Sequence, residues 1–253
     1  MTQRKIALVT GGSRGLGRDM AINIAKKGID VVLTYHTNQS AAEAVVAEIN
    51  SAGNKGYALQ LDSSNTKSLD AFYHQLSDYL QSQYGRAHFD YLVNNAGTGI
   101  QTPFAETTEE QFDEMMNIHF KGVYFLTQQA LPFMNDGGSI INVSSGLARF
   151  SFPGYSAYAC MKGGIEVFTR YLAKELGSRG ITANVVAPGA VATDFAGGSN
   201  KTNEQKRGLI SNITALGRVG EPEDIGGIVA FLCTEDAHWI NAQRIEASGG
   251  TLI

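Results

Sequence analysis

Cysteine is scarce in this sequence: the 253 residues include two, Cys160 and Cys233. So small a number excludes a disulfide framework and is typical of a protein from a reducing compartment. Long apolar runs are missing as well, since none approaches the roughly 20 residues that a membrane helix needs. The N-terminal residues lack the apolar segment of a secretory signal. We therefore expect a cytoplasmic protein that does not enter a membrane.

A large excess of charge is also missing. The net charge is −4, from 20 basic and 24 acidic residues, so the composition does not favour binding to nucleic acid or to anionic membranes. We expect neither partner, and no metal site. Apolar residues make up 43% of a chain that is long enough for one large α/β domain. Since no linker, repeat or low-complexity segment divides it, we expect residues 1–253 to form a single domain.

Short apolar runs alternate with amphipathic stretches along the chain. Runs rich in β-branched and aliphatic residues are typical of parallel strands buried on both faces. We expect strands at Ile6–Val9, Val31–Thr34, Tyr57–Leu61, Tyr91–Val93, Ser139–Val143, Thr182–Ala187 and Arg244–Glu246. We expect helices at Leu16–Lys27, Ser40–Ala52, Thr66–Tyr84, Thr108–Phe133, Ser156–Gly177 and Pro222–Cys233. This alternation predicts the α/β class: a single-domain, Rossmann-like, doubly wound parallel sheet of about seven strands with helices on both faces.

One long segment, residues 189–220, shows no strand or helix pattern. It contains Gly197-Gly198-Ser199-Asn200 and several charged residues. Irregular loops of this length in compact domains are usually functional lids or mobile segments. We therefore predict a substrate lid here.

Tyr158 and Lys162 stand four residues apart in an expected helix, which places them on one face, one turn apart. An ammonium beside a phenol favours the phenolate and lowers the tyrosine pKa from about 10 toward neutrality. Such a tyrosine can give or take a proton near physiological pH. The same spacing is common on solvated helix faces, so its meaning depends on what the rest of the chain builds around it.

A glycine-rich segment, Thr10-Gly-Gly-Ser-Arg-Gly15-Leu-Gly17, follows the first expected strand and opens the first helix. Its glycines permit a tight turn and let the backbone approach a pyrophosphate at the positive end of the helix. The spacing differs from the G-x-G-x-x-G fingerprint, and the alternative is a turn that serves packing alone. Because the segment follows the first strand, we favour cofactor binding by Gly11, Ser13, Gly15, Leu16 and Gly17.

The end of the second expected strand bears on which dinucleotide binds. It reads Leu33-Thr-Tyr-His-Thr-Asn38, without a carboxylate to bond the ribose 2′-hydroxyl of NAD. Arg14 offers a cation for a 2′-phosphate, and His36 and Thr37 offer donors beside Tyr35. We therefore predict NADP(H) in preference to NAD(H). The alternative for Arg14 is a solvated surface cation.

The third expected strand is followed by Asp62 and Ser63. The Asp62 carboxylate can accept a hydrogen bond from the adenine amino group of a dinucleotide. It can equally cap the helix that follows. We include Asp62 and Ser63 among the candidate cofactor residues.

In their order along the chain, Thr10–Gly17, Asn94–Gly97, Ser145, Tyr158 and Lys162 make this sequence resemble the short-chain dehydrogenase/reductase family, including its 3-oxoacyl carrier-protein reductases and related carbonyl reductases. The likeness covers nearly the whole chain. It implies a seven-stranded Rossmann-like domain assembled as a dimer or tetramer, and we expect a homotetramer. It also implies that Asn95, Ala96 and Gly97 lie beside the cofactor.

The resemblance assigns further roles. Ser145 precedes Tyr158 by 13 positions, the spacing of the family, and would bind the substrate carbonyl. Its neighbour Ser144 is better suited to a turn-stabilising role. Pro188, Gly189, Val191 and Thr193 would hold the nicotinamide carboxamide, and Phe195 would belong to the lid.

One position departs from the family pattern. The segment Asn117-Ile-His-Phe-Lys-Gly122 has His119 where the family has a catalytic asparagine, whose backbone carbonyl helps to hold a water that contacts the lysine. A backbone role can survive a change of side chain, so we prefer a neutral substitution. The alternative is that His119 adds a titrating group near the active site.

Together these features predict an NADP(H)-dependent oxidoreductase that transfers a hydride between nicotinamide and a ketone or secondary alcohol, with Tyr158 as proton donor or acceptor. The substrate is a 3-oxoacyl thioester or a small-to-medium ketone. Aromatic residues at Phe150, Phe152, Tyr155 and Phe195 suggest an apolar pocket, although core or interface roles are as plausible. The alternatives are a non-catalytic NADP(H)-binding sensor or scaffold on this fold, and a methyltransferase that binds S-adenosylmethionine.

Overall fold

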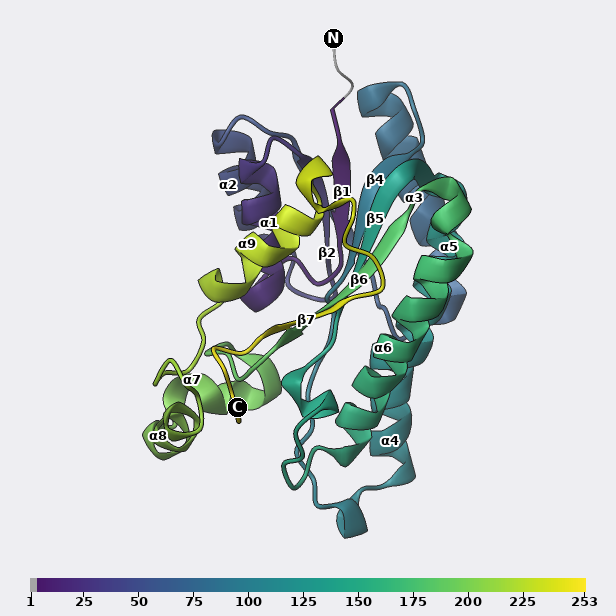
Figure 1. The fold of residues 1–253 in the computed structure, drawn as a ribbon. Coiled ribbons are helices and arrows are strands. Elements are labelled where there is room, and N and C mark those ends of the chain that lie inside the picture. Colours follow the sequence, from purple (N-terminus) through teal and green to yellow (C-terminus); the bar gives the residue numbers. More distant parts are fainter. Residues whose placement is uncertain (1–3) are drawn as a thin grey trace.

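The computed structural model describes residues 4–253 and contains one sheet of seven parallel strands. The strands follow the order β3-β2-β1-β4-β5-β6-β7 (Figure 1). Their bounds are β1 Ile6–Val9, β2 Asp30–Tyr35, β3 Gly56–Gln60, β4 Phe89–Asn94, β5 Met134–Val143, β6 Thr182–Pro188 and β7 Arg244–Ala247. This confirms the predicted doubly wound sheet.

Helices cover both faces of the sheet (Figure 1). They are α1 Gly15–Lys26, α2 Gln39–Ser51, α3 Leu69–Tyr84, α4 Glu109–Met116, α5 Gly122–Ala130, α6 Ser156–Glu175, α7 Ser199–Thr202, α8 Glu204–Asn212 and α9 Glu223–Leu232. One core layer packs α1, α2 and α9 on the sheet, and the other packs α3, α5 and α6. No helix in residues 4–253 combines the length and apolarity needed to cross a bilayer.

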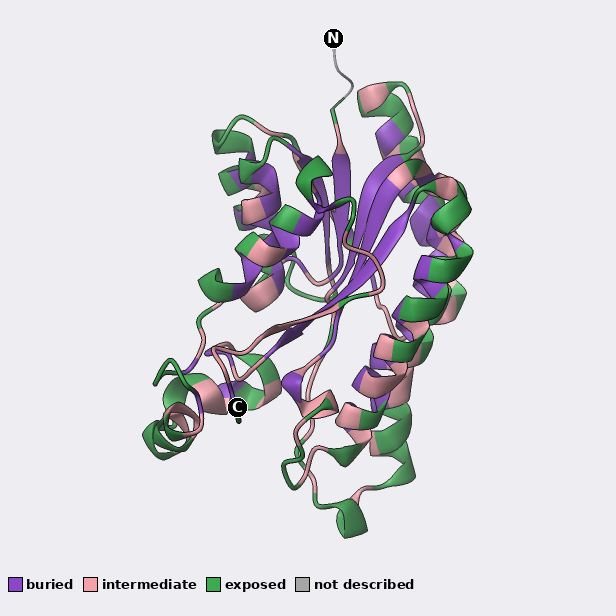
Figure 2. Ribbon diagram, in the orientation of Figure 1, coloured by how far each residue is buried: buried purple, intermediate pink, exposed green. Residues whose placement is uncertain are grey.

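The central strands of the sheet are buried on both faces, as Figure 2 shows, whereas the edge strands β3 and β7 are partly exposed. Every residue of β1, β4 and β6 is buried, which explains why these segments are mostly apolar rather than alternating. Strand β1 lies between β2 and β4, so the chain direction of the crossovers reverses there. In open parallel sheets, ligands bind beyond the carboxyl ends of the strands at this switch point.

The expected helix at residues 108–133 is not continuous. Helix α4 leads into a π turn, Asn117–Lys121, then α5, and the chain ends the region in a 3₁₀ turn, Leu131–Phe133. At the end of the π turn, Gly122 lies so close to the Ser63 carbonyl that a Cβ would sit 2.1 Å from its oxygen. The tight contact at a glycine lets this helix pass directly beneath the loop after β3.

Strand β5 begins at Met134, five residues before the predicted start at Ser139. The pairing with β4 shifts register between Phe89 and Tyr91. The strand accommodates this irregularity at Gly137, whose φ of +75° is accessible to glycine at little cost.

The segment at residues 189–220, called the lid below, is not irregular as predicted. It contains a 3₁₀ turn, Phe195–Gly198, followed by α7 and α8. The Asn203 side chain caps α8 by accepting a hydrogen bond from Lys206 N. The two ends of the lid pair through a short bridge, in which Ala192 N donates to Gly220 O at 2.8 Å. The lid is therefore an ordered appendage closed at its base.

Candidate active site

Tyr158 and Lys162 lie on the buried face of α6, with exposed fractions of 8% and 5%. The predicted alignment on one helix face is therefore present, but the face is not solvated. Lys162 Nζ donates to the carbonyl oxygen of Val143, at the end of β5, across 2.7 Å. It also lies 5.5 Å from the centroid of the Tyr158 ring. The lysine thus ties α6 to the carboxyl end of the sheet.

The two side chains carry shifted pKa values. Burial raises the pKa of the Tyr158 phenol, opposed by a hydrogen bond with Ser145, and burial lowers the pKa of Lys162 to about 8. The expectation that Lys162 lowers the tyrosine pKa is therefore wrong for this closed form. Desolvation of the phenolate outweighs the hydrogen bond with Ser145, because the phenol is shielded from water.

Ser144 and Ser145 project in different directions from the end of β5. Ser144 Oγ lies 2.8 Å from Glu166 Oε1 and 3.4 Å from the Lys162 carbonyl. Ser145 Oγ accepts a hydrogen bond from Leu147 N at 3.2 Å. The structure thus gives the turn-stabilising bond to Ser145 and not, as predicted, to Ser144. Ser145 nevertheless also contacts Tyr158, which keeps it beside the phenol.

His119 lies in the π turn and is 1% exposed. Its Nε2 lies 2.7 Å from the Thr98 carbonyl oxygen, so Nε2 carries the proton and donates it. Its ring meets the Tyr158 ring edge to face at 4.9 Å. Burial and the charge of Lys162 hold the pKa of His119 well below 6.5, so the ring is neutral. The buried Nδ1 has no hydrogen-bond partner among residues 4–253.

The glycine segment is held by the loop after β4. Thr10 Oγ1 accepts hydrogen bonds from the backbone nitrogens of Asn95 and Ala96, each at 3.0 Å. Asn95 Nδ2 donates to Thr10 O at 2.9 Å and to Gly11 O at 3.3 Å. The candidates Asn95 and Ala96 therefore support the glycine segment through their own contacts, and they bring two distant motifs of the sequence together.

The tight fold of this segment explains its glycines. Gly11 and Gly15 adopt φ values of +65° and +53°. A Cβ on Gly17 would sit 2.1 Å from the Gly11 carbonyl oxygen, and one on Gly97 would sit 2.6 Å from His119 Cε1. Ser13 is half-buried, and Leu16 packs on the core layer of α1.

The segment that follows β6 also contacts the glycine segment. A Cβ on Gly15 would lie 3.5 Å from Thr193 Cγ2, so Thr193 stands against the glycine segment. Pro188 ends β6 and is buried, and Gly189 N donates to Ala247 O at 3.1 Å. Val191 begins the bridge that closes the base of the lid. The candidates Pro188, Gly189, Val191 and Thr193 thus gather beyond the carboxyl end of β6.

Candidates for the adenosine end lie at the carboxyl ends of β2 and β3. Arg14, His36 and Thr37 are exposed, and Tyr35, Asp62 and Ser63 are half-buried. His36 Nε2 lies 3.9 Å from Asp62 Oδ2, which brings two of them together. Asp62 Oδ1 accepts hydrogen bonds from Ser64 N and Ser64 Oγ. Burial alone would raise the pKa of Asp62, but these hydrogen bonds outweigh the effect of burial, so the pKa is lowered. The turn that follows is capped by Asn65 rather than by Asp62.

The site fits a dinucleotide phosphate. Helix α1 starts at Gly15. Among residues 4–253, no side chain caps this end of the helix, and its first turn contains no acidic residue. Its first backbone N–H groups are therefore open to an anion, which the positive end of the helix also attracts. Arg14, directly before the helix, adds a guanidinium to the same end.

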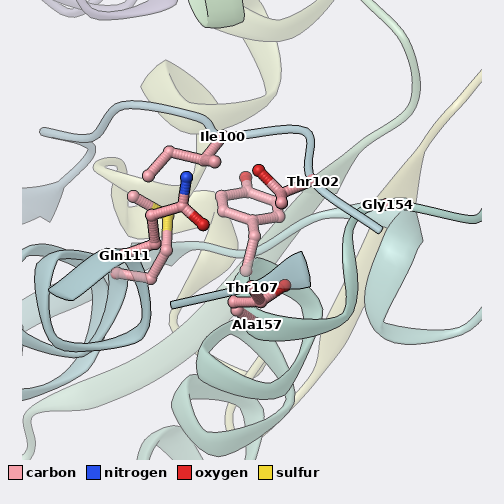
Figure 3. A pocket seen from close by; sticks show the side chains of 8 residues that line it. Ile100, Thr102, Thr107, Gln111, Gly154 and Ala157 are labelled. Atoms are coloured by element: carbon pink, nitrogen blue, oxygen red, sulfur yellow. The ribbon is translucent and has the colours of Figure 1, made fainter. Parts of the chain in front are cut away.

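The space in front of Tyr158 is nearly filled. Figure 3 shows the side chains around a cavity of about 10 Å³, lined by Ile100, Thr102, Thr107, Gln111, Met115, Gly154, Ala157 and Tyr158. Such a volume holds about one water molecule. Phe195 of the lid packs on Tyr158, with ring centroids 5.7 Å apart, and a Cβ on Gly99 would lie 2.6 Å from its ring. The structure therefore shows a closed lid, which must move before a ketone can reach Tyr158.

A larger cavity of about 300 Å³ adjoins the first at Gly154. It is lined by Pro103, Phe104, Leu147, Phe150, Ser151, Phe152, Pro153, Gly154, Tyr155, Ser156 and Ala159. The predicted aromatic lining is thus present for Phe150, Phe152 and Tyr155. Phe195 lies instead against Tyr158.

Sequence reasoning missed Lys206, which connects the lid to the rest of the site. Its Nζ lies 2.7 Å from Ser199 Oγ and 3.3 Å from the Tyr155 hydroxyl, which in turn donates to Gln101 Oε1 at 3.2 Å. Tyr155 lies 51 residues before Lys206, so no local pattern could have indicated that contact.

Comparison with known proteins agrees with this geometry. A family model described as enoyl-(acyl carrier protein) reductase matches residues 11–251. A hydroxynaphthalene reductase-like protein, Arp2, of Metarhizium brunneum is 34% identical over 98% of this chain and 95% of its own length. A short-chain type dehydrogenase/reductase of Picea abies is 39% identical over 97% of this chain and 92% of its own length.

Solved structures are similar as well. The angucycline C-6 ketoreductase LanV with bound NADP superposes with a TM-score of 0.93 and 40% identity, covering 98% of this chain and 95% of that one. The reductase LugOII, described as catalysing keto-reduction at C1 during lugdunomycin biosynthesis, gives a TM-score of 0.94 and 36% identity over the whole of both chains. The chain belongs to the short-chain dehydrogenase/reductase family. It is therefore an oxidoreductase of that type, which removes the methyltransferase alternative.

Proposed function

We propose that this protein reduces ketones with NADPH, and that Tyr158 supplies the proton. The observation that carries the proposal is the convergence of Ser145, Tyr158 and Lys162 at the carboxyl end of β5, beside a glycine segment that fits a dinucleotide phosphate. Bound NADPH would supply the hydride. The protein supplies position, proton and charge.

In this proposal the Ser145 and Tyr158 hydroxyls bind the carbonyl oxygen of the substrate, and Tyr158 donates a proton to the alkoxide as it develops. Lys162 holds a positive charge behind the phenol and is positioned to bond the nicotinamide ribose. Pro188, Gly189, Val191 and Thr193 are proposed to hold the carboxamide. His119, neutral and buried, is proposed to keep a hydrogen-bond acceptor beside Lys162 through Nδ1.

Preference for NADP(H) over NAD(H) is part of the proposal. The exposed cation of Arg14 and the exposed donors of His36 and Thr37 lie where a 2′-phosphate would be recognised. LanV contains NADP in its solved structure, and a blue fluorescent protein similar to this chain contains NADPH.

The substrate class is proposed from the larger cavity. Its walls include four aromatic residues and it adjoins, at Gly154, the small cavity that Tyr158 lines, so it suits an extended apolar ketone. One similar protein, Arp2, is a hydroxynaphthalene reductase-like protein, and the landomycin C-6 ketoreductase LanV has a solved structure with bound rabelomycin. We therefore favour an aromatic ketone over a 3-oxoacyl thioester.

A homo-oligomer is also proposed, either a dimer or a tetramer. The outward faces of α4, α5 and α6 expose a set of large apolar side chains that water solvates poorly, namely Phe112, Tyr124, Phe125, Val167 and Tyr171.

The deciding experiment follows NADPH oxidation against a panel of aromatic ketones, small ketones, and 3-oxoacyl and enoyl thioesters, with NADH run in parallel. We expect turnover with an aromatic ketone and a clear preference for NADPH. NADPH binding without turnover of any member would instead support a sensor or scaffold. Turnover of the enoyl thioester alone would replace ketone reduction by double-bond reduction.

A further inference from the structure

Four charged side chains form a connected group beside the loop after β5, which carries Ser145, and we call this group the Arg244 network. It consists of Arg149, Glu166, Arg244 and Glu246. Arg244 Nε bonds Glu166 Oε1 at 2.6 Å, and Arg244 Nη1 bonds Glu246 Oε2 at 2.9 Å. Arg149 Nη1 also bonds Glu246 Oε2 at 2.9 Å. The network joins β7, α6 and the loop after β5.

Arg244 uses its third nitrogen on the backbone of the active site. Its Nη2 donates to the carbonyl oxygen of Ser145 at 3.3 Å. Each of its three nitrogens therefore binds a different part of the fold: helix α6, strand β7 and the loop that carries the serine. Only the planar guanidinium offers donors in this fixed fork, so lysine cannot replace it.

The same network also holds the residue before Ser145. Ser144 Oγ lies 2.8 Å from Glu166 Oε1, the oxygen that Arg244 Nε also binds. Glu166 follows Lys162 by one helical turn and lies on the same face of α6 as Tyr158. The backbone around Ser145 is thus fixed relative to the helix that carries the other two catalytic candidates.

Three of the four side chains are largely sheltered from water, whereas the Arg149 side chain is 59% exposed. The side chains of Glu166, Arg244 and Glu246 are 16%, 23% and 15% exposed. Two cations and two anions balance within it. Loss of Arg244 would leave two carboxylates facing each other in a partly desolvated site, and the Ser145 carbonyl would lose its donor.

We propose that Arg244 is a positioning residue for the reaction: it sets the place of the Ser145 hydroxyl against Tyr158 by holding the Ser145 carbonyl from behind. Glu166 and Glu246 orient its guanidinium. The inference rests on the proposed reductase function, because it assigns the network a consequence for turnover. A displacement of about 1 Å at a reacting group can reduce a rate about 100-fold, so small shifts of this loop matter.

A double-mutant cycle tests this proposal. The four proteins are the wild type, Arg244→Gln, Ser145→Ala and the double variant, each assayed for kcat and KM with the best ketone and for NADPH binding by fluorescence. We expect Arg244→Gln to lower kcat about 10- to 100-fold with NADPH affinity within about twofold of the wild type. We expect the double variant to be little slower than Ser145→Ala, because both changes disable the same hydroxyl.

Arg179→Gln is the matched control. Arg179 also binds a carboxylate, Asp136, and backbone carbonyls of Leu131 and Met134, but at the opposite end of β5. It should lower the melting temperature without a large change in kcat, and its effect should multiply with that of Ser145→Ala. If Arg244→Gln behaves in the same way as Arg179→Gln, the network is merely structural and the proposal is overturned.

A second measurement separates this inference from the proposed function. Amide hydrogen exchange at residues 144–150 should quicken in Arg244→Gln and in the milder Arg244→Lys, but not in Arg179→Gln, and it requires no substrate. A wild-type protein that reduces no ketone would sink the proposed function even with this exchange pattern intact. Unchanged exchange in both Arg244 variants would sink the positioning role whatever the enzyme reduces.

Discussion

Two regions meet at the phenol of Tyr158, and they are built in opposite ways. On one side is α6, whose inward face carries Tyr158 and Lys162 and is fastened to β5 by a buried bond between Lys162 and Val143. On the other side is the lid, whose helices α7 and α8 are mostly exposed or half-buried, as their green and pink colouring in Figure 2 shows. The lid contacts Tyr158 through the ring of Phe195, and it contacts the hydroxyl of Tyr155, directly before α6, through Lys206.

The difference shows how the two requirements of catalysis are divided. Proton transfer needs groups fixed to a fraction of an ångström, and these groups lie where backbone and core allow little motion. Substrate entry needs an element that moves, and the lid has few buried apolar contacts to lose when it opens. Variants on the two sides should therefore change different kinetic constants.

The largest effect should follow removal of the proposed proton donor, the Tyr158 hydroxyl. Tyr158→Phe keeps the ring against His119 and Phe195 but removes the hydroxyl, so we expect kcat to fall by about 10²- to 10⁴-fold. NADPH binding should be retained, as fluorescence titration will show. Tyr155→Phe is the control: it removes a hydroxyl that bonds Gln101 and Lys206 at the lid, so it should change KM more than kcat. Near-normal turnover in Tyr158→Phe would remove Tyr158 from the mechanism.

A smaller effect, on selectivity, should follow truncation of the lid contact. In the wild type, the Phe195 ring covers Tyr158 and occupies the space beside Gly99, and Phe195→Ala removes this ring. We expect kcat/KM to shift by about tenfold in favour of the bulkier of two ketones, since discrimination by apolar contacts is of this size. Leu209→Ala, an exposed position on α8, should leave selectivity unchanged.

The same variant bears on the phenol itself. Burial raises the pKa of Tyr158 in the closed form, so admitting water should lower that pKa toward its ordinary value. The alkaline limb of the kcat/KM profile should then move to lower pH in Phe195→Ala. Equal selectivity and equal pH profiles in Phe195→Ala and the wild type would show that Phe195 does not close the site.

The sequence predicted the catalytic side far better than the lid, for a physical reason. Tyr158 and Lys162 share one helix, and the glycine segment is one turn, so local geometry determines both. The direction of Ser144 and Ser145 depends on Glu166 and Leu147, which lie on different elements. That choice was predicted wrongly because tertiary contacts decide it.

The broken helix between residues 108 and 133 illustrates the same limit. Its apolar period continues through the region, but the π turn at Asn117–Lys121 adds a residue where the helix passes the Ser63 carbonyl. Helices α7 and α8 were missed because their sequences are short and polar, so periodicity gives little signal.

The lid contact at Lys206 should have a moderate effect. Lys206→Met removes the bonds to Ser199 and Tyr155, each worth about 0.5–1.5 kcal/mol. We expect a severalfold rise in KM for the ketone and faster hydrogen exchange over residues 199–212, with kcat little changed. Lys201→Met, which loses an exposed bond to Asp194 within the lid, is the control. If both variants match the wild type in KM and exchange, Lys206 does not restrain the lid.

The smallest effect concerns stability on the fixed side of the site. His119 remains neutral in the folded protein because its pKa lies well below 6.5, whereas an unfolded histidine gains a proton near that pH. The unfolded state therefore binds more protons below pH 6.5, and folding stability falls as the pH decreases. His119→Asn removes this titration while keeping a polar side chain of the kind the family carries at this position.

Urea unfolding at pH 7.5, 6.5 and 5.5 measures the difference. Between the two lower values the wild type should lose about 1 kcal/mol of unfolding free energy that His119→Asn does not lose. His74→Asn provides the control for the substitution itself, since His74 is exposed on α3. Parallel curves for wild type and His119→Asn would mean that His119 takes up a proton in the folded state, so that it could titrate beside Lys162. Retained turnover in His119→Asn would support a neutral substitution at this position.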